Sequence, residues 1–506
     1  MNKSKKIICA AAGIIPFVLF PLTACLSRND SGGTAARKTT GNSSGAEITL
    51  EKNELTLTIG ESEKLNYFIS SDSALLVWSS SAPLVASVSS DGIVTALAFT
   101  SGGTSRFTSS PATGTAVITV KTADGGAGAS VTVTTTTAAR TDMMSLPPLK
   151  DQFSNYFMLG NIFNPRDVAS NGSSVTNEQL THHYNVLTHE NDMKPRYLAP
   201  DRNGRTIQFN FTTADRMINA ALASGFKVHG HTLLWHNQIP NWQQDIADAG
   251  RDTALAAMRD YISGVVRHFA GRVYSWDVLN EAFPDNAGSG ADWKNAIRSG
   301  ARGEGQGANP WYAAIGSDFV YEGYLAARLA DPSAILYYND YNTDNSNRAR
   351  LIRDMVRDVN ARYKEAYPNE KRLLIEGIGM QEHHNTGVSA ARVKDAIDMF
   401  RPLGVILSVS ELDVLGQSWN AFSSGTGSGT QKDDISTVTN IGLFDQARLY
   451  AEYFRVYLDN ADIIERVSMW GVTDDRSWRS GGLPLLFDYD GRAKPAYYRV
   501  ISTLRK

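Results

Sequence analysis

Cysteine is nearly absent from this sequence. The chain has 506 residues but only two cysteines, Cys9 and Cys25, and both lie within its first 25 residues. A disulfide framework is therefore excluded for the rest of the chain, which must be stabilised by a hydrophobic core. Hydrophobic residues make up 42% of the sequence, as is normal for a globular protein. A chain of this length contains about two to four domains.

An excess of charge of one sign is also missing. Lysine and arginine total 49 against 52 aspartate and glutamate residues, which gives a formal net charge of −3. The overall charge therefore gives no indication that nucleic acid is a partner. We also expect no cofactor and no bound metal, and we expect the protein to be monomeric.

The N-terminal apolar run is too short to span a bilayer comfortably. It extends from Ile7 to Phe20 and follows three lysines, which is the charge order of an export signal. The letters LTAC at residues 22–25 come directly after it and resemble a bacterial lipobox. Residues 1–24 are thus expected to be a lipoprotein signal peptide, cleaved to leave a diacylglyceryl group on Cys25. The alternative is an ordinary secretory signal with an incidental cysteine.

Residues 25–45 contain few apolar side chains and many Ser, Thr, Gly and Asn residues. This composition predicts a disordered tether that holds the following domains away from a membrane. Leu26 follows Cys25, where an aspartate would indicate retention in the inner membrane of some bacteria. The expected location is therefore the cell envelope, as a lipoprotein of the outer membrane, and exposure at the cell surface stays open.

Short alternating apolar runs fill residues 46–135, separated by Gly, Ser and Asp turns. They read ITL, LTLTIG, LLVWSS, VASVSS, GIVTAL, AVITVK and SVTVT, a pattern that predicts a small antiparallel β-sandwich. The stretch WSSSAPLVASVSSDGIVTA, with the later GTAVITV, resembles bacterial Ig-like modules of group 2, apart from an inserted segment near residues 98–112. Because the region carries no titratable cluster, we expect a spacer; glycan or protein binding is the alternative.

After a Thr-rich, Pro-containing linker over residues 136–148, apolar strand-like runs alternate with amphipathic helical patterns. Eight such units follow within residues 149–506, beginning at MLGNI and ending at VSMWGVTD. This repetition predicts an α/β fold, a (β/α)8 TIM barrel. A doubly wound open sheet is the alternative, but no Gly-rich phosphate loop follows the first strand.

The predicted strands end in polar side chains, and in a parallel barrel all of these ends open on one face. Two glutamates at these ends lie in similar runs: YSWDVLNEAF places Glu281 after the fourth strand, and VILSVSELDV places Glu411 near the end of the seventh. The remaining polar and aromatic residues at the strand ends are Glu190, Asn191, Lys194, His231, Trp235, His236, Gln238, Asn280, Asn339, Asp340, Gln381, His383, Asp413, Trp470 and Trp478. So many polar groups on one rim predict an active site.

Glu281 and Glu411 come from strands on opposite sides of the predicted mouth, so their carboxyl groups can face each other across a cleft lined by Trp and amide groups. Paired carboxylates with aromatic side chains are typical of a glycosidase. One carboxyl group must be protonated, to give a proton to the leaving oxygen. The other must be ionised, to attack the anomeric carbon.

In these residues the chain resembles glycoside hydrolase family 10, the endo-β-1,4-xylanases, over nearly all of residues 146–504. The motifs that carry the resemblance stand in the family's order and read ENDMK, HTLLWHNQIP, WDVLNEA, NDYN, GMQEHH, SELD and WGVTDDRSW. The resemblance implies retaining, double-displacement hydrolysis of internal β-1,4-xylosidic bonds. It also implies that the partners of the protein are xylan and xylo-oligosaccharides.

The same resemblance assigns roles to single residues. Glu281 is expected to be the acid/base and Glu411 the nucleophile. His383 would hydrogen-bond the nucleophile with Asp413 behind it, and Asn280 would hold the 2-hydroxyl group of the sugar being cleaved. The expected substrate contacts are Glu190, Asn191, Lys194, His231 and Gln238 on the non-reducing side, Trp235, Trp470 and Trp478 at the central subsites, and Gln381.

The sequence departs from the family pattern in three places. Ser410 stands where many relatives have threonine, and longer insertions lie near residues 285–309 and 416–440. The insertions leave the outer subsites and the tolerance of xylan branches open. Two other functions also stay open: a β-1,4-glucanase or mannanase on a similar barrel, and a glycan-binding protein that keeps the cleft without turnover.

Overall fold

The structure is a computed structural model that describes residues 47–58, 61–70, 75–83, 85–96, 113–136, 141–302, 307–424 and 440–504. The predicted signal peptide over residues 1–24, the tether over residues 25–45 with its Cys25, and the inserted segment near residues 98–112 lie outside these ranges. None of the helices in the described part of the chain is long and apolar enough to cross a lipid bilayer.

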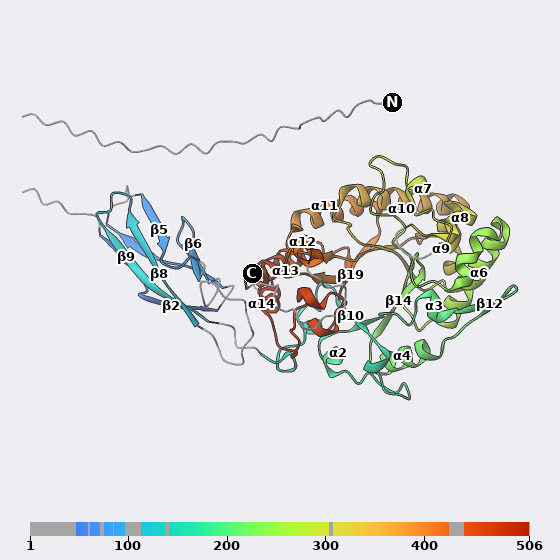
Figure 1. Ribbon diagram of the computed structural model, residues 1–506, viewed down its shortest axis with the longest axis horizontal. Helices are drawn as coiled ribbons and strands as arrows, with labels where there is room; N and C mark the ends of the chain where they lie inside the picture. The colour runs from blue at the N-terminus through green and yellow to red at the C-terminus, as the bar shows by residue number, and fades with distance from the viewer. Residues whose placement is uncertain are drawn as a thin grey trace, which may run out of the picture. The chain divides into compact units, whose positions relative to one another are not determined.

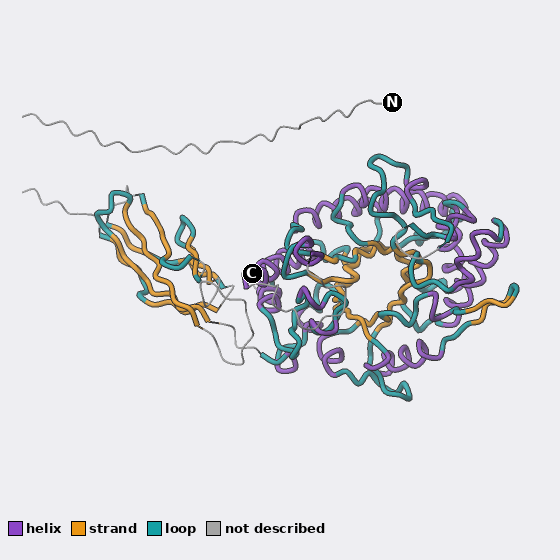
Figure 2. The backbone as a smooth tube through the Cα atoms, viewed as in Figure 1, coloured by secondary structure: helices purple, strands orange, loops and turns teal. Residues whose placement is uncertain are grey.

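Eight parallel strands close into a barrel. They are β10 (Met158–Phe163), β11 (Val186–His189), β14 (Lys227–Leu234), β15 (Ser275–Asn280), β16 (Ile335–Asp340), β17 (Gly377–Met380), β19 (Ile406–Val414) and β20 (Ile464–Met469). Each strand pairs with the next, β20 pairs back with β10, and the β17–β19 pair completes the ring. Figures 1 and 2 show this ring of strands enclosed by helices. The predicted (β/α)8 barrel is confirmed.

One helix of the outer layer follows each barrel strand. These helices are α2 (Glu178–His183), α4 (Thr212–Ala223), α6 (Arg251–His268), α9 (Asp318–Ala330), α10 (Ser346–Ala366), α11 (Ala390–Phe400), α13 (Asn440–Asp459) and α14 (Pro495–Ser502). The other elements before and between them are η1 (Met143–Ser145), α1 (Leu149–Gln152), η2 (Pro165–Asp167), α3 (Pro195–Leu198), β12 (Asp201–Asn203), β13 (Thr206–Gln208), α5 (Asn241–Asp245), η3 (Ile246–Asp248), α7 (Trp293–Ala296), α8 (Pro310–Ile315), β18 (His383–His384), η4 (Arg401–Leu403), α12 (Trp419–Ser424), η6 (Asp474–Arg476) and η7 (Ser480–Gly482).

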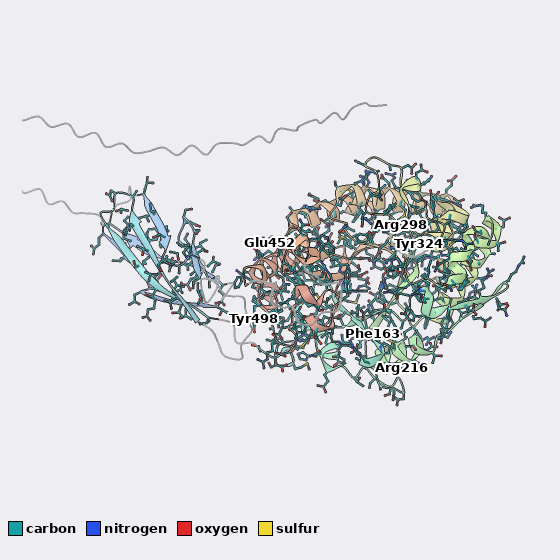
Figure 3. The ribbon with its side chains drawn as sticks, viewed as in Figure 1. Phe163, Arg216, Arg298, Tyr324, Glu452 and Tyr498 are labelled. Atoms are coloured by element: carbon teal, nitrogen blue, oxygen red, sulfur yellow. The ribbon has the colours of Figure 1, made fainter. Side chains whose placement is uncertain are left out.

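Helices α9 and α10 show why these segments fold as they do. Asn345 caps α10, because its side chain accepts hydrogen bonds from the backbone N–H groups of Asn347 and Arg348. On α9, the fully buried Tyr324, which Figure 3 labels, donates a hydrogen bond through its hydroxyl to the carbonyl of Tyr337 in β16, at 3.0 Å. The stripe that α10 buries recurs every three or four residues and consists of Leu351, Ile352, Met355, Val356, Val359 and Tyr363.

Part of the predicted linker belongs to the folded barrel domain. Residues 141–148, assigned above to the linker over residues 136–148, pack onto the end of the barrel. The backbone N–H of Met143 donates to the carbonyl of Gly491 at 2.9 Å, and the Met143 side chain is fully buried. The hydroxyl of Tyr498 donates to Oγ1 of Thr141 at 2.9 Å. Composition alone hides such packing, because a single buried methionine leaves no periodic pattern.

The only regular elements in the described residues between 47 and 136 are β-strands. β2 (Glu54–Thr58), β9 (Gly128–Thr136), β8 (Thr113–Thr122) and β5 (Leu76–Ser80) make one sheet in this order, β3 (Ser62–Lys64), β7 (Ile93–Ala96) and β6 (Ala86–Val88) make a second, and β1 (Ile48–Leu50) pairs with β4 (Tyr67–Ile69). Residues that alternate along the strands share one core, which includes Leu55, Leu57, Val94, Ile118, Val131 and Val133. This strand-rich unit agrees with the predicted small sandwich.

One strand pair corrects the expectation of a purely antiparallel sandwich. β2 and β9 are parallel, with Glu54 opposite Thr132 and Thr58 opposite Thr136. Alternating apolar residues specify which face a strand buries, but they do not specify the direction of its neighbour. These two strands are far apart in sequence, so no hairpin imposes an antiparallel pair. β3 and β4 fall outside the predicted runs, because SEK and YFI lack apolar–polar alternation.

Candidate active site

Both glutamates lie at the carboxyl-terminal mouth of the barrel. Glu281 follows the last residue of β15, and Glu411 lies near the end of β19. The backbone of Glu281 is left-handed, with φ of 54°, a conformation that costs a residue other than glycine about 1–3 kcal/mol and persists only where neighbours hold it. Its N–H donates to the carbonyl of Asn339 at 2.9 Å, and its carbonyl accepts from Nε of Arg298 at 2.9 Å.

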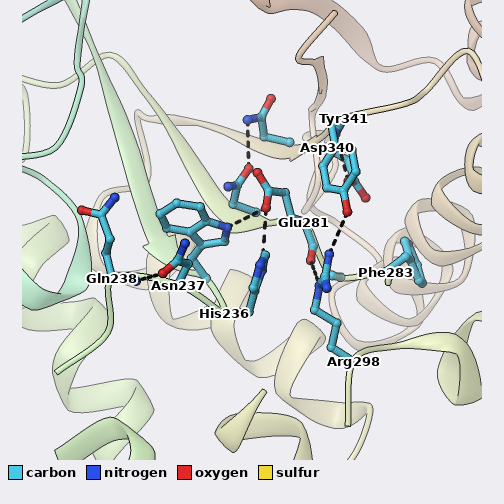
Figure 4. A network of polar contacts seen from close by, with 12 residues as sticks. His236, Asn237, Gln238, Glu281, Phe283, Arg298, Asp340 and Tyr341 are labelled. Carbon is cyan, nitrogen blue, oxygen red and sulfur yellow. Dashed lines mark hydrogen bonds and ion pairs between the residues drawn. The ribbon is translucent and has the colours of Figure 1, made fainter. Parts of the chain in front are cut away.

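The carboxylate of Glu281 is held by two N–H donors (Figure 4). Nε1 of Trp235 donates to one oxygen at 2.9 Å, and Nε2 of Gln381 donates to the other at 2.8 Å. Nδ1 of His236 lies 3.7 Å away. Burial, aided by the charge of Arg298, lowers the pKa of His236 to about 3, so this ring is neutral at pH 7. The Glu281 side chain stays 14% exposed and is open to a ligand.

The carboxylate of Glu411 has different partners. Nδ2 of Asn339 donates to one oxygen at 2.8 Å, and Nε2 of His383 lies 3.1 Å from the other. Oγ of Ser410 donates to Oδ1 of Asn339 at 2.6 Å, which orients the amide so that its N–H groups face Glu411. A Cβ atom at Gly379 would lie 2.2 Å from the same Oδ1. Only glycine therefore leaves room for this amide.

Asn280 connects the two glutamates. Its Oδ1 accepts from Asn339 at 2.9 Å and from Gln381 at 3.3 Å, and these two amides also donate to Glu411 and Glu281. Its Nδ2 is buried and has no hydrogen-bond partner within the described residues. A buried N–H group without a partner is costly. This group is therefore ready to donate to a ligand, as the predicted contact with a sugar hydroxyl requires.

His383 bridges the second glutamate and Asp413. Its Nδ1 lies 2.9 Å from Oδ2 of Asp413, opposite the nitrogen that faces Glu411. Burial acts to lower the pKa of His383, but the charges of the two carboxylates outweigh it and raise this pKa to about 9. Asp413 also accepts from Arg479 and, at 3.2 Å, from Nε1 of Trp478. The imidazole is thus positively charged at neutral pH beside Glu411.

The raised pKa of His383 makes stability depend on pH. The pKa is about 6.5 in an unfolded chain and about 9 in the folded one, so the folded state holds an extra proton between these values. The contribution of His383 is complete below pH about 6.5 and is lost as pH rises through about 9, about 3 kcal/mol in all. Urea unfolding of the wild type and His383→Gln, from about pH 6 to about pH 9.5, should show their difference shrinking. A difference that is constant with pH would contradict the assigned charge.

A second polar group lies on the loops after β11 and β14. Nζ of Lys194 donates to Oδ1 of Asn191 at 3.0 Å and lies 4.9 Å from the ring centre of Trp235. Nε2 of Gln238 approaches the same oxygen at 3.4 Å. Burial lowers the pKa of Lys194, while the surrounding carboxylates, including Glu190, act in the opposite direction. These side chains form a polar group at one side of the mouth, beside Glu281 and Glu411.

His231 and the two remaining predicted tryptophans complete the mouth. Nδ1 of His231 lies 2.8 Å from Oδ2 of Asp277, and its ring centre is 5.6 Å from that of Trp470. Trp470 is buried, whereas Trp478 is 52% exposed. The structure thus brings the predicted barrel residues to one mouth, and their individual roles stay predictions. The described residues contain no group of three or more His, Cys, Asp or Glu side chains that could hold a metal ion.

Two buried arginines hold the backbone that carries Glu281. Arg298 binds the Glu281 carbonyl, and NH1 of Arg348 donates to the carbonyl of Phe283 at 2.9 Å and to Oδ1 of Asp340 at 2.9 Å. Neither arginine follows a strand: one lies in an inserted loop and the other in the helical pattern of α10, so a search of strand ends does not find them. The supporting residues that sequence reasoning did not single out are Asp277, Arg298, Arg348 and Arg479.

Comparison with known proteins agrees with this geometry. The profile of Glycosyl hydrolase family 10 matches residues 148–503. The chain belongs to this family. The endo-1,4-beta-xylanase of Geobacillus stearothermophilus is 34% identical over 369 residues, which are 71% of this chain and 99% of that protein. Endo-1,4-beta-xylanase A of Thermotoga neapolitana is 32% identical over 365 residues, but the aligned part spans only 31% of that longer protein.

Solved structures of family 10 members extend the comparison. A bacterial Ig-like domain containing GH10 xylanase from termite gut is 54% identical, with a TM-score of 0.73, and the match covers 89% of this chain and 98% of that one. An intracellular xylanase from Thermoanaerobacterium saccharolyticum, in complex with xylotetraose, is 32% identical with a TM-score of 0.57 and covers 70% of this chain and 98% of that one. The family resemblance read from the motifs is confirmed.

Proposed function

We propose that this protein is a retaining endo-β-1,4-xylanase that hydrolyses internal bonds of xylan. The observation that carries the proposal is a pair of mouth carboxylates with separate partners: Glu281 is bound by an indole and an amide, and Glu411 by an amide and an imidazolium. Family 10 relatives named endo-1,4-beta-xylanase support the choice of substrate. The network suits two chemical roles, because each carboxylate has its own electrostatic surroundings.

The reaction then has two steps. The carboxylate of Glu411, which lies beside the positively charged His383, attacks the anomeric carbon while Glu281 gives its proton to the leaving oxygen, and a glycosyl-enzyme forms on Glu411. Glu281, now ionised, takes a proton from water, which attacks the same carbon and releases the sugar with its original configuration. Nδ2 of Asn280 donates to the 2-hydroxyl group of the sugar at the centre.

The tryptophans expected at the central subsites, Trp235, Trp470 and Trp478, support xylan over polymers of hexoses. A large ring on the C5 side of the central sugar accommodates a pentose better than a hexose with its hydroxymethyl group. The test is the release of reducing sugar from xylan, carboxymethylcellulose and mannan at equal concentrations. We expect release from xylan to exceed the other two by about 100-fold or more. Faster release from carboxymethylcellulose or mannan would favour the glucanase or mannanase, and tight xylan binding without turnover would favour the non-catalytic alternative.

We also propose that the N-terminal unit is a bacterial Ig-like spacer and that lipid on Cys25 anchors a monomeric protein to the outer membrane. The match to the termite-gut xylanase, which contains a bacterial Ig-like domain, supports the first part, because it covers 89% of this chain, whereas the match to the Thermoanaerobacterium saccharolyticum xylanase covers 70%. The letters LTAC and the polar tether support the second part. Mass spectrometry should find diacylglyceryl on an N-terminal Cys25, and an unmodified cysteine would contradict the anchor.

A further inference from the structure

Two tryptophan side chains beside the mouth are about half exposed. Trp478 is 52% exposed, and Trp419, in helix α12 after β19, is 50% exposed. Large aromatic side chains usually bury most of their surface, as Trp276 and Trp311 do in this barrel. The predicted active site accounts for Trp478. It gives no role to Trp419, which lies in the insertion near residues 416–440.

Arg479 joins the two exposed rings. Its guanidinium carbon lies 5.7 Å from the ring centres of both Trp419 and Trp478. The same guanidinium binds Asp413, which accepts from Nε1 of Trp478 and faces His383. Trp419 is therefore one guanidinium group away from the hydrogen-bond network that supports the nucleophile. The arginine that binds the Asp413 partner of His383 therefore also contacts this second ring.

The strand order shows on which side of the mouth Trp419 lies. In the ring β10, β11, β14, β15, β16, β17, β19, β20, strand β19 is four places from β14 in either direction. The loop after β14 carries Gln238, and the loop after β11 carries Glu190 and Lys194, which are the expected contacts for the non-reducing side of the substrate. The segment after β19 lies across the mouth from them. This is the side on which the leaving part of the substrate would extend.

Packing within α12 accounts for only part of the Trp419 ring. The ring centres of Trp419 and Phe422 are 5.7 Å apart, at an interplanar angle of 39°. Phe422 is itself only partly buried, and half of the tryptophan surface still meets water. An exposed flat aromatic ring beside a polysaccharide cleft suits one class of ligand. The C–H faces of a pyranose ring stack on such a surface, which needs an apolar plane rather than a hydrogen-bonding pocket.

We propose that Trp419 binds a xylosyl residue on the leaving-group side of the cleft, beyond the position next to Trp478. The inference rests on the proposed xylanase function and adds a sugar-binding position to it. Trp419 then affects how tightly long substrates bind, and it takes no part in bond cleavage itself. Long xylo-oligosaccharides gain affinity from this ring, and a substrate that is too short to reach it does not.

The test compares a short and a long substrate in Trp419→Ala. The aryl group of 4-nitrophenyl β-xylobioside fills only the first position on the leaving-group side, so its kcat/KM should stay within about twofold of the wild type. The kcat/KM for xylohexaose should fall about tenfold, as expected for the loss of one stacked ring. With xylopentaose labelled with ¹⁸O at its reducing end, cleavage should move toward that end. Trp419→Tyr, which keeps a flat ring, should restore most of the wild-type pattern.

Two further variants keep the test decisive. Trp419→Leu keeps an apolar side chain on α12 but removes the flat ring, so it should shift the cleavage position as alanine does even if alanine unfolds the helix. Tyr367→Ala removes a 39% exposed aromatic side chain that follows α10, at the other end of the barrel, and should change nothing. Equal loss on both substrates, or an unchanged cleavage pattern, would overturn the role of Trp419. Failure of the wild type to cleave xylan would overturn the proposed function itself.

Discussion

Glu411→Ala should stop the first chemical step for every leaving group, lowering kcat by about 10⁴-fold or more. The wild-type carboxylate is almost buried between Asn339 and His383, which hold both of its oxygens. No other carboxylate in this network has that position, so a good leaving group cannot compensate for its loss. The measurement is kcat for aryl xylobiosides whose phenols range from weakly to strongly acidic. All of them should be affected alike.

Azide gives a second measurement for this variant. It can occupy the space left by the Glu411 side chain and attack a xylobiosyl β-fluoride once, which gives the α-azide. The matched control is Glu452→Ala on the outer helix α13, where the side chain pairs with Arg448 at 2.9 Å and stays partly exposed (Figure 3). That variant should keep full activity. A burst of phenol or a β-azide from Glu411→Ala would show that another group is the nucleophile.

Glu281→Ala should instead separate the two steps of the reaction. An aryl xylobioside whose leaving group needs no protonation should still form the glycosyl-enzyme, because Glu411 and His383 are intact. Hydrolysis should then stall, since no base activates water. We expect a burst of phenol, a kcat lower by about 10²–10⁴-fold, and a lowered apparent KM. Substrates with poor leaving groups should lose the first step as well.

Added azide should restore turnover of Glu281→Ala, because it needs no base, and the product should be the β-azide. Glu281→Gln is the matched control for shape, since it preserves the side-chain volume between Trp235 and Gln381 but cannot donate or accept the proton. It should show the same dependence on the leaving group. Equal losses for all leaving groups would remove the acid/base role. An α-configured first product from the wild type, seen by NMR, would mean an inverting mechanism.

The site could be predicted from the sequence because of how a parallel barrel is built. Polar residues after apolar strands are unusual, and the fold brings all such ends to one face. Glu281, Asn280 and Glu411 are visible for this reason. Arg348 is not, because it lies in the regular pattern of a helix and looks like any solvated cation there. The unpaired N–H of Asn280 is also invisible in sequence, since it depends on which donors its two neighbouring amides satisfy.

The fold was predictable to a similar depth. Periodicity identifies elements and their buried faces, so the eight units of the barrel follow from the sequence. Pairing direction and single contacts carry no periodic signal. The parallel β2–β9 pair and the burial of Met143 therefore come from the structure alone, because both are set by residues distant along the chain.

The contact between residues 141–148 and the end of the barrel also bears on the order in which the barrel strands follow one another along the chain. The N–H of Ala493 donates to the carbonyl of Thr141 at 2.9 Å, and Asp142 pairs with Arg492 in an antiparallel bridge. The segments that precede the first barrel strand and follow the last one thus lie next to each other. In a closed ring of strands, no strand is structurally the first. If these neighbouring ends were spliced together and the chain were opened at the β12–β13 hairpin, every barrel strand would keep both of its present neighbours. The packing of the barrel therefore does not depend on which strand comes first in the chain. A permuted chain that starts at another strand should form the same barrel.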